Sequence, residues 1–204
     1  MDPVREPKLA PPGAGLPRFE LWVGRLLFRF RRMTSGREEA SARFAHEHGR
    51  IRELIRPLNA ETGARRVLIA RPKGLEDSSR YWSVWMTLDH LRIVHREMAQ
   101  VIARLARGEQ IPGQASTAAV KPDPAVTQLV VTEFHAACAE LTQTVAAIPD
   151  LRTPVRYTHP WFGPLDAAGW HILSAGHLRI HRHQIELILR EQKRAPHASG
   201  KPVL

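Results

Sequence analysis

Two histidines near the C-terminus, His177 and His181, have a spacing that can do metal chemistry. They stand four residues apart in a segment that we predict to be a long helix. This spacing places both imidazoles on one helix face, with Cβ atoms about 6 Å apart, and two such rings can share one divalent metal. The pair alone is weak evidence, because the chain contains 11 histidines. A metal site therefore requires a third ligand from another element.

The rest of the composition limits what that ligand can be. The single cysteine, Cys138, excludes both an intramolecular disulfide and a thiolate-rich zinc site. Any metal ligands must therefore be imidazole nitrogens and oxygens. The sequence contains no Ser/His/Asp arrangement, glycine-rich phosphate loop or paired-carboxylate motif that would offer a competing catalytic centre.

Length and charge favour a single-domain cytoplasmic protein. A chain of 204 residues suits one domain with extensions. It lacks an apolar run of about 18 residues, and its N-terminus, MDPVREPKLAPPG, lacks the features of a secretory signal. The net charge of +10 raises the question of nucleic acid, but basic residues are spread through every segment with acids between them. Nucleic-acid binding is therefore disfavoured.

The first 34 residues form a separate unit in our prediction. Residues 1–17 hold five prolines and two glycines, which predicts a mobile arm. A basic amphipathic helix follows, because Phe19, Trp22, Leu26 and Phe30 recur at helical spacing with arginines on other faces. Such a helix could dock on an anionic membrane surface or a partner. We favour the simpler interpretation, an extra helix laid over the core or a homodimer contact.

The remaining chain predicts an all-α fold, a four-helix bundle over residues 35–194 with a long crossover connection. Ser35 and Glu38 have the form of a capping box for the first helix, which ends before Pro57. Ser83 is the N-cap of the second, and Asp123 and Asp166 cap the third and fourth. The four predicted helices cover residues 35–56, 83–107, 123–149 and 166–193. Residues 59–80 are a long ordered connection and 195–204 a flexible tail.

Several histidines compete to be the third ligand. His90 lies at the edge of the apolar stripe of the second helix and can point into the bundle, whereas His95 lies on the stripe itself. His159 could reach the site from the turn before the fourth helix, although a turn-stabilising hydrogen bond is the simpler role. His48 is expected to be a hydrogen-bonded core residue, and His135 has no claim beyond lying beside Phe134. His171 and His183 are expected to be solvated or peripheral.

Several of these features together resemble the DinB/YfiT-like superfamily. The matching features are Trp82-Ser83 with His90 eight residues after the tryptophan, the HPxFGxL turn from His159, Trp170, and His177-x-x-x-His181-x-x-Gln184. The resemblance covers roughly Ser35 to Arg190. It implies a four-helix bundle that holds a metal by one histidine of the second helix and two of the fourth.

Carried onto this chain, the resemblance assigns the metal ligands as His90, His177 and His181, and it prefers His90 over His95 by motif position. One departure is Met86, where the family usually has an acidic or amide residue three after the serine that begins the second helix. This weakens the helix cap and not the metal site.

Three neutral imidazoles leave at least one coordination position for water or substrate, which is typical of a catalytic site. This ligand set favours zinc or nickel, permits iron and disfavours magnesium or calcium. Acceptors for the rings' other N–H groups could be Glu97, Asp89, Glu140 or Gln184.

The resemblance implies, as one possibility, an enzyme that transfers groups to a low-molecular-weight thiol, with a metal-bound thiolate or water as nucleophile. The alternatives are a non-catalytic metal-binding or interaction module that docks through its basic first helix, and a haem-binding bundle. The sequence assigns no catalytic residue beyond the metal ligands.

Overall fold

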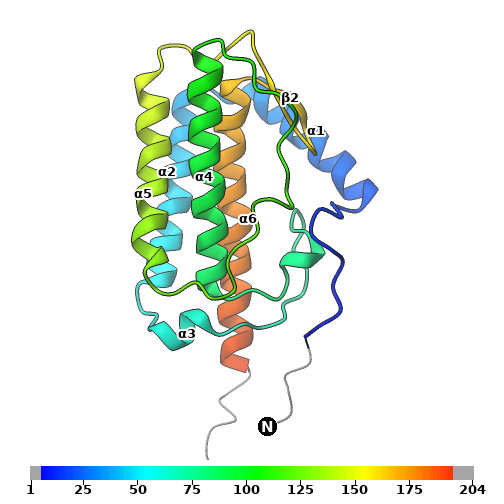
Figure 1. Ribbon diagram of the computed structural model, residues 1–204, viewed down its shortest axis with the longest axis vertical. Coiled ribbons are helices and arrows are strands. Elements are labelled where there is room, and N and C mark those ends of the chain that lie inside the picture. The colour runs from blue at the N-terminus through cyan, green and yellow to red at the C-terminus, as the bar shows by residue number, and fades with distance from the viewer. Residues whose placement is uncertain (1–5, 195–204) are drawn as a thin grey trace, which may run out of the picture.

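Four long helices form a bundle, as predicted. The computed structural model describes residues 6–194; the predicted tail at 195–204 lies outside them. The bundle consists of α2 (Arg37–Ile55), α4 (Val84–Ala106), α5 (Val130–Ala147) and α6 (Ala167–Arg194). The helix α4 packs between α5 and α6, and α6 also packs against α2 (Figure 1). Because α6 lies between α2 and α4, the connection over residues 56–83 is the predicted crossover.

The bundle core is built from the apolar stripes of these helices. On α4 the residues of the apolar stripe are buried, and complete burial of a leucine or isoleucine side chain stabilises a fold by about 1.5–3 kcal/mol. At its start Ser83 is the N-cap, with its side chain accepting a hydrogen bond from the Met86 backbone N–H. The stripe consists of Val84, Leu88, Leu91, Met98, Ile102 and Leu105.

The capping box predicted for the first bundle helix does not form. The N-cap of α2 is Gly36, no side chain caps the helix, and the Ser35 hydroxyl is buried without a hydrogen-bond partner in the described chain. The reason is the preceding helix, α1 (Arg18–Thr34), whose C-cap is Ser35. Only two residues join α1 to α2, so Ser35 is held by its backbone bond to Arg31 O and cannot also cap α2.

The third bundle helix begins later than predicted, at Val130 instead of Asp123. Asp123 does accept a hydrogen bond, but from the Ala125 N–H two residues on, which forms a turn and not a helix cap. Its own N–H donates to the Asp89 carboxylate of α4 at 2.9 Å. This tie fixes the chain beside α4, and Leu129, just before α5, is 78% exposed.

The connection over 59–80 is ordered, as expected, and includes α3 (Ala60–Ala64) and the short 3-10 helix η1 (Asp77–Ser79). It packs closely: a Cβ on Gly63 would lie 1.9 Å from the Trp85 ring. The described part of the N-terminal arm lies against this connection, with the Ala10 N–H donating to Asp77 and the Gly13 N–H to Glu76. The arm therefore differs from the mobile segment that its composition predicted.

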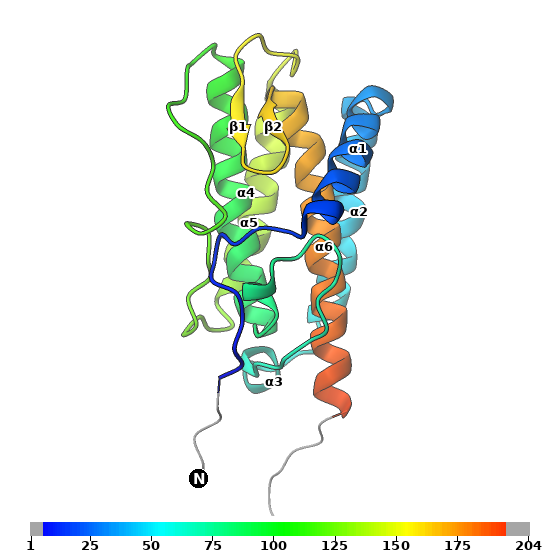
Figure 2. The ribbon, with the colours of Figure 1, turned by 90° about the vertical axis from the view of Figure 1, so that its right-hand side faces the viewer.

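Two short elements complete the fold. The strands β1 (Tyr157–His159) and β2 (Gly163–Leu165) form an antiparallel hairpin just before α6. Gly163 has a φ of +74°, which glycine adopts without strain. Beside the hairpin, α1 leans against α6 (Figure 2). Between residues 6 and 194, every helix is too short or too polar to cross a membrane.

Candidate metal centre

The packing of α4 against α6 brings together the three histidines that the family resemblance implied. His90 comes from α4, and His177 and His181 come from successive turns of α6. The possible ligand atoms of the three rings lie within 4.8 Å of one another, and no other such group of histidine, cysteine or acidic residues occurs in the described chain. His90 and His181 are buried, whereas His177 is partly accessible.

Two of the rings are oriented by hydrogen bonds on their outer nitrogens. His90 Nδ1 lies 2.6 Å from the Val120 carbonyl oxygen, and His181 Nδ1 lies 2.7 Å from the Gln184 side-chain oxygen. Because both partners are acceptors, each Nδ1 must carry the proton, and each Nε2 then carries a lone pair. The Gln184 amide is itself fixed by donating to the Ser79 carbonyl at 2.8 Å.

The spacing of the inner nitrogens fits a metal ion. The Nε2 atoms of His90 and His177 are 3.1 Å apart. Two nitrogens bound to one tetrahedral zinc at about 2.0–2.1 Å would be separated by about 3.3 Å. The outer nitrogen of His177 is different, because Nδ1 is buried and has no hydrogen-bond partner among residues 6–194. Within residues 6–194, hydrogen bonds therefore orient the rings of His90 and His181. The ring of His177 is positioned mainly by its place on α6.

Burial keeps all three rings neutral. It lowers the pKa of His90 to about 4, and it lowers the pKa values of His177 and His181 well below the usual range; the neighbouring histidines add to the effect in all three. A neutral imidazole is the form that binds a metal. Near pH 7 the site therefore does not have to lose protons before a cation enters.

A tryptophan closes one side of the site. The Trp82 ring stacks nearly parallel to His181, with centroids 6.3 Å apart, and is tilted against His90 at 5.3 Å. The Lys121 ammonium lies 5.5 Å from the centre of the Trp82 ring and pairs with Glu76 at 2.9 Å. This side of the triad is thus filled by packed side chains.

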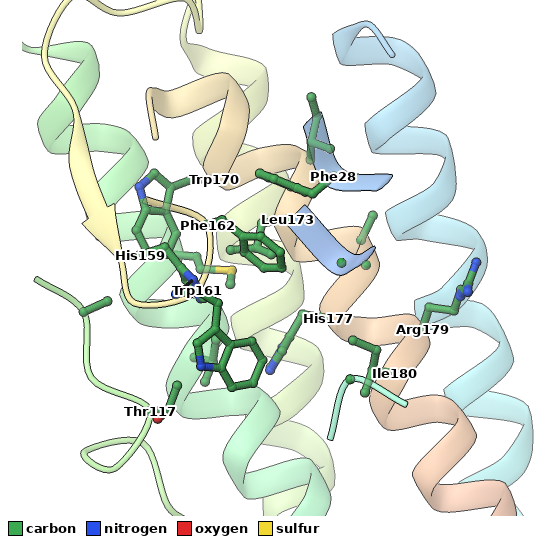
Figure 3. A pocket seen from close by; sticks show the side chains of 18 of the residues that line it. Phe28, Thr117, His159, Trp161, Phe162, Trp170, Leu173, His177, Arg179 and Ile180 are labelled. Atoms are coloured by element: carbon green, nitrogen blue, oxygen red, sulfur yellow. Dashed lines mark hydrogen bonds between the residues drawn. The ribbon is translucent and has the colours of Figure 1, made fainter. Parts of the chain in front are cut away.

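The other side opens into a cleft of about 1650 Å³ that all three histidines line. Figure 3 shows His177 pointing into it beside Trp161 and Phe162. His159 stacks on Phe162, with ring centroids 5.1 Å apart, and its Nδ1 accepts the Trp161 backbone N–H, which is the turn-stabilising role expected for it. The arrangement offers three nitrogen donors at the base of an accessible space with mostly aromatic and aliphatic walls.

The structure separates the competing histidines. His95 is fully buried behind His177, its ring edge-on to His177 at 5.6 Å and its Nδ1 3.9 Å from the Cys138 sulfur. His183 is exposed, as predicted. The prediction of a peripheral His171 was wrong: it is buried, with Nε2 3.2 Å from the Ser41 hydroxyl, because this face of α6 packs against α2.

Of the four side chains proposed to support the ligands, only Gln184 contacts one. Asp89 instead binds Arg92 and the Asp123 N–H, Glu140 faces Arg96, and Glu97 lines the cleft. The support that sequence reasoning missed is the Val120 carbonyl. Every residue has a backbone oxygen, so the sequence does not mark this one. The only indication was that the long linker containing Val120 had to pass near the bundle.

Comparison with known families and structures agrees with this fold. The model of the DinB superfamily matches residues 66–185, a range that contains all three histidines. A solved structure described as TT2238, a four-helix bundle protein, is similar in fold, with a TM-score of 0.54 and 22% sequence identity over 73% of this chain and 97% of that chain. No curated protein matches the chain. Because the family model covers more than half of its length, the chain belongs to the DinB superfamily.

Proposed function

We propose that the protein is a metal-dependent enzyme of the thiol S-transferase type. In this proposal His90, His177 and His181 bind one divalent transition metal, with zinc or nickel favoured and iron permitted. The observation that carries it is the convergence of three neutral imidazoles at the base of an open cleft. A structural site would instead be closed by a fourth protein ligand.

A divalent cation at this position would lower the pKa of a thiol or water that reaches it, and so supply a nucleophile near pH 7. The protein's own contribution is positioning. Val120 and Gln184 fix two rings, and Trp82 keeps solvent from one side of the triad. The aromatic walls of the cleft, Trp161 and Phe162 among them, would bind the apolar part of the second substrate.

The chemistry required of such a site is a simple displacement. The sulfur of a low-molecular-weight thiol forms a bond to an electrophilic carbon of the second substrate as the bond from that carbon to its leaving group breaks. The thiol proton passes to solvent and the leaving group departs with the electron pair. The chain needs only to hold both partners at the open side of the triad.

The test is the rate at which a small thiol reacts with a simple alkylating agent in the presence of the purified, zinc-loaded protein. Cysteine and glutathione serve as thiols and iodoacetamide as the electrophile. We expect saturable acceleration that His177→Gln removes. The matched control is His48→Gln, the same change at a half-buried histidine outside the cleft.

Two results would contradict the proposal. One is a zinc-loaded protein in which none of the thiols reacts faster than in solution, which would favour the alternative of a non-catalytic metal-binding module. The other is acceleration that survives His177→Gln, because the reaction would then take place elsewhere on the molecule.

A further inference from the structure

The helix α1 rests on the bundle by the less apolar of its two faces. The residues turned toward the protein are Leu21, Gly24, Phe28 and Arg32, which recur at i, i+3, i+7 and i+11 and are half-buried. Phe28 packs on Phe162 with ring centroids 4.5 Å apart, and Arg32 pairs with Asp166 at 2.8 Å. These contacts fix which side of α1 faces solvent, and none of its residues is fully buried.

The opposite face is a continuous apolar stripe that nothing in the described chain covers. Its members recur at i, i+3, i+7, i+11 and i+14, and each is between 56% and 78% exposed. Exposed apolar side chains scattered singly are ordinary, but a contiguous patch marks an interaction site. The stripe consists of Phe19, Trp22, Leu26, Phe30 and Met33, with Leu27 beside it at 63% exposure. The helix α1 is laid over the bundle, as expected, but this apolar face is turned outward.

The charges beside the stripe are all of one sign. Arg18, Arg25 and Arg29 lie at i, i+7 and i+11 along one edge of the stripe and are exposed, and Arg25 also donates from Nε to the Trp161 carbonyl at 2.6 Å. The single acid of the helix, Glu20, is turned away from it and held by the Arg71 guanidinium and the Gly74 N–H, each at 2.5 Å. The solvent-facing side of α1 thus combines apolar residues with cations.

We propose that α1 docks on an anionic membrane surface. The helix would lie in the plane of the membrane surface. Its apolar stripe would be buried at the boundary between headgroups and acyl chains, and its arginines would contact the lipid phosphates. A second copy of the chain fits the face less well. A 17-residue helix presents a strip about 25 Å long and 10 Å wide, less than the roughly 800 Å² per partner of a stable dimer. An antiparallel two-fold contact would also bring one arginine row close to the other.

Docking by α1 would bring the cleft that the three histidines line to the lipid surface. Phe19, Leu27 and Phe30 of α1 line the same cleft as His177. In Figure 1 the helix stands at the side of the molecule, outside the four-helix bundle. A protein lying on a membrane by α1 therefore has one end of its cleft at the headgroups.

The test is co-sedimentation of the full chain with phosphatidylcholine vesicles, with and without about one-third phosphatidylglycerol. We expect binding to the anionic vesicles that weakens severalfold between about 0.05 and 0.5 M salt. Leu27→Glu should lower the binding by about tenfold or more. The matched control is Leu129→Glu, the same change at a 78% exposed leucine before α5, which should bind as the wild type does. Circular dichroism and metal content check that both variants fold.

Three outcomes would overturn the proposal. One is no binding to anionic vesicles at low salt. Another is equal binding to neutral and anionic vesicles, because the arginine row would then be irrelevant. The third is unchanged vesicle binding by Leu27→Glu together with conversion of a dimer to a monomer in light scattering, which would assign the stripe to a second copy of the chain.

Discussion

Residues 6–194 contain two groups of packed histidines, and these groups use their nitrogens in opposite ways. In the pair between α2 and α5, His48 Nε2 and His135 Nδ1 lie 2.7 Å apart, so one ring donates to the other. In the triad between α4 and α6, the outer nitrogens of His90 and His181 are bonded to oxygens, and the inner nitrogens converge. Each ring of the pair has the other ring as its partner, whereas the triad has oxygens behind two of its rings and three inner nitrogens close together.

Burial lowers histidine pKa values in both groups, although His48 and His135 are only half-buried. It lowers the pKa of His48 to about 4, the same value as for His90, and it lowers the pKa of His135 as well. The two groups differ in which atoms accept hydrogen bonds from the rings. An oxygen that accepts from one ring nitrogen leaves a lone pair on the other nitrogen for a metal. In the pair, the hydrogen-bond partner of each ring is the other imidazole. A cluster of buried histidines is therefore a candidate metal site only when something else takes up the outer N–H groups.

The largest effect should come from removing a ligand. His181→Gln or His177→Gln should weaken zinc binding by roughly 1000-fold, because one of only three protein donors is lost. His48→Gln should bind zinc as the wild type does. Competition with a fluorescent chelator of known affinity measures all three. The distinction between the two groups fails if His48→Gln loses as much affinity as the triad variants.

A smaller effect should follow from removing the acceptor behind a ligand. Gln184→Leu leaves His181 Nδ1 without its partner and should lower zinc affinity by about 10- to 100-fold. The comparable change in the other group, His135→Gln, should have no effect on zinc. Thermal unfolding of the metal-free variants is the control, because Gln184 also binds the Ser79 carbonyl. Wild-type zinc affinity in Gln184→Leu would show that the acceptor does not matter.

The smallest expected effect is the contribution of His48 to the pH dependence of stability. His48 has a folded pKa of about 4 against about 6.5 in an unfolded chain. Between these values the unfolded state binds more protons, so the free energy of unfolding falls as the pH is lowered from 6.5 toward 4. Partial exposure of His48 reduces its share to about 1 kcal/mol at pH 5.

Urea unfolding of the metal-free protein at pH 7 and pH 5 measures this effect. The loss of stability between the two pH values should be smaller in His48→Gln than in the wild type. The other buried histidines still contribute in the variant, so the dependence should be reduced and not abolished. An identical pH dependence in both proteins would mean that the pair is already as easily protonated as free histidine.

Much of the site followed from local pattern. The i, i+4 spacing of His177 and His181 predicted a shared face, and the Trp82-Ser83 motif fixed the start of α4. The choice of His90 over His95 came from motif position. Periodicity alone favoured neither, because both residues lie near one stripe and only the packing of α4 on α6 shows which ring reaches the pair.

Other features depended on contacts that a sequence does not display. The Val120 carbonyl behind His90 belongs to a linker with no periodicity. The start of α5 was misplaced because Asp123 is bound to Asp89 on another helix. The outward stripe of α1 looked like a core face, since amphipathic spacing predicts that a face exists and not which way it turns.

The central claim is a three-imidazole metal centre with an open position, and X-ray absorption of the zinc-loaded protein tests it directly. We expect three imidazole nitrogens and an oxygen at about 2.0–2.1 Å, with the oxygen replaced by one sulfur at about 2.3 Å when a small thiol is added. His48→Gln should give the same spectra. A spectrum with fewer than three imidazoles, or a four-ligand shell that a thiol does not alter, would contradict the account.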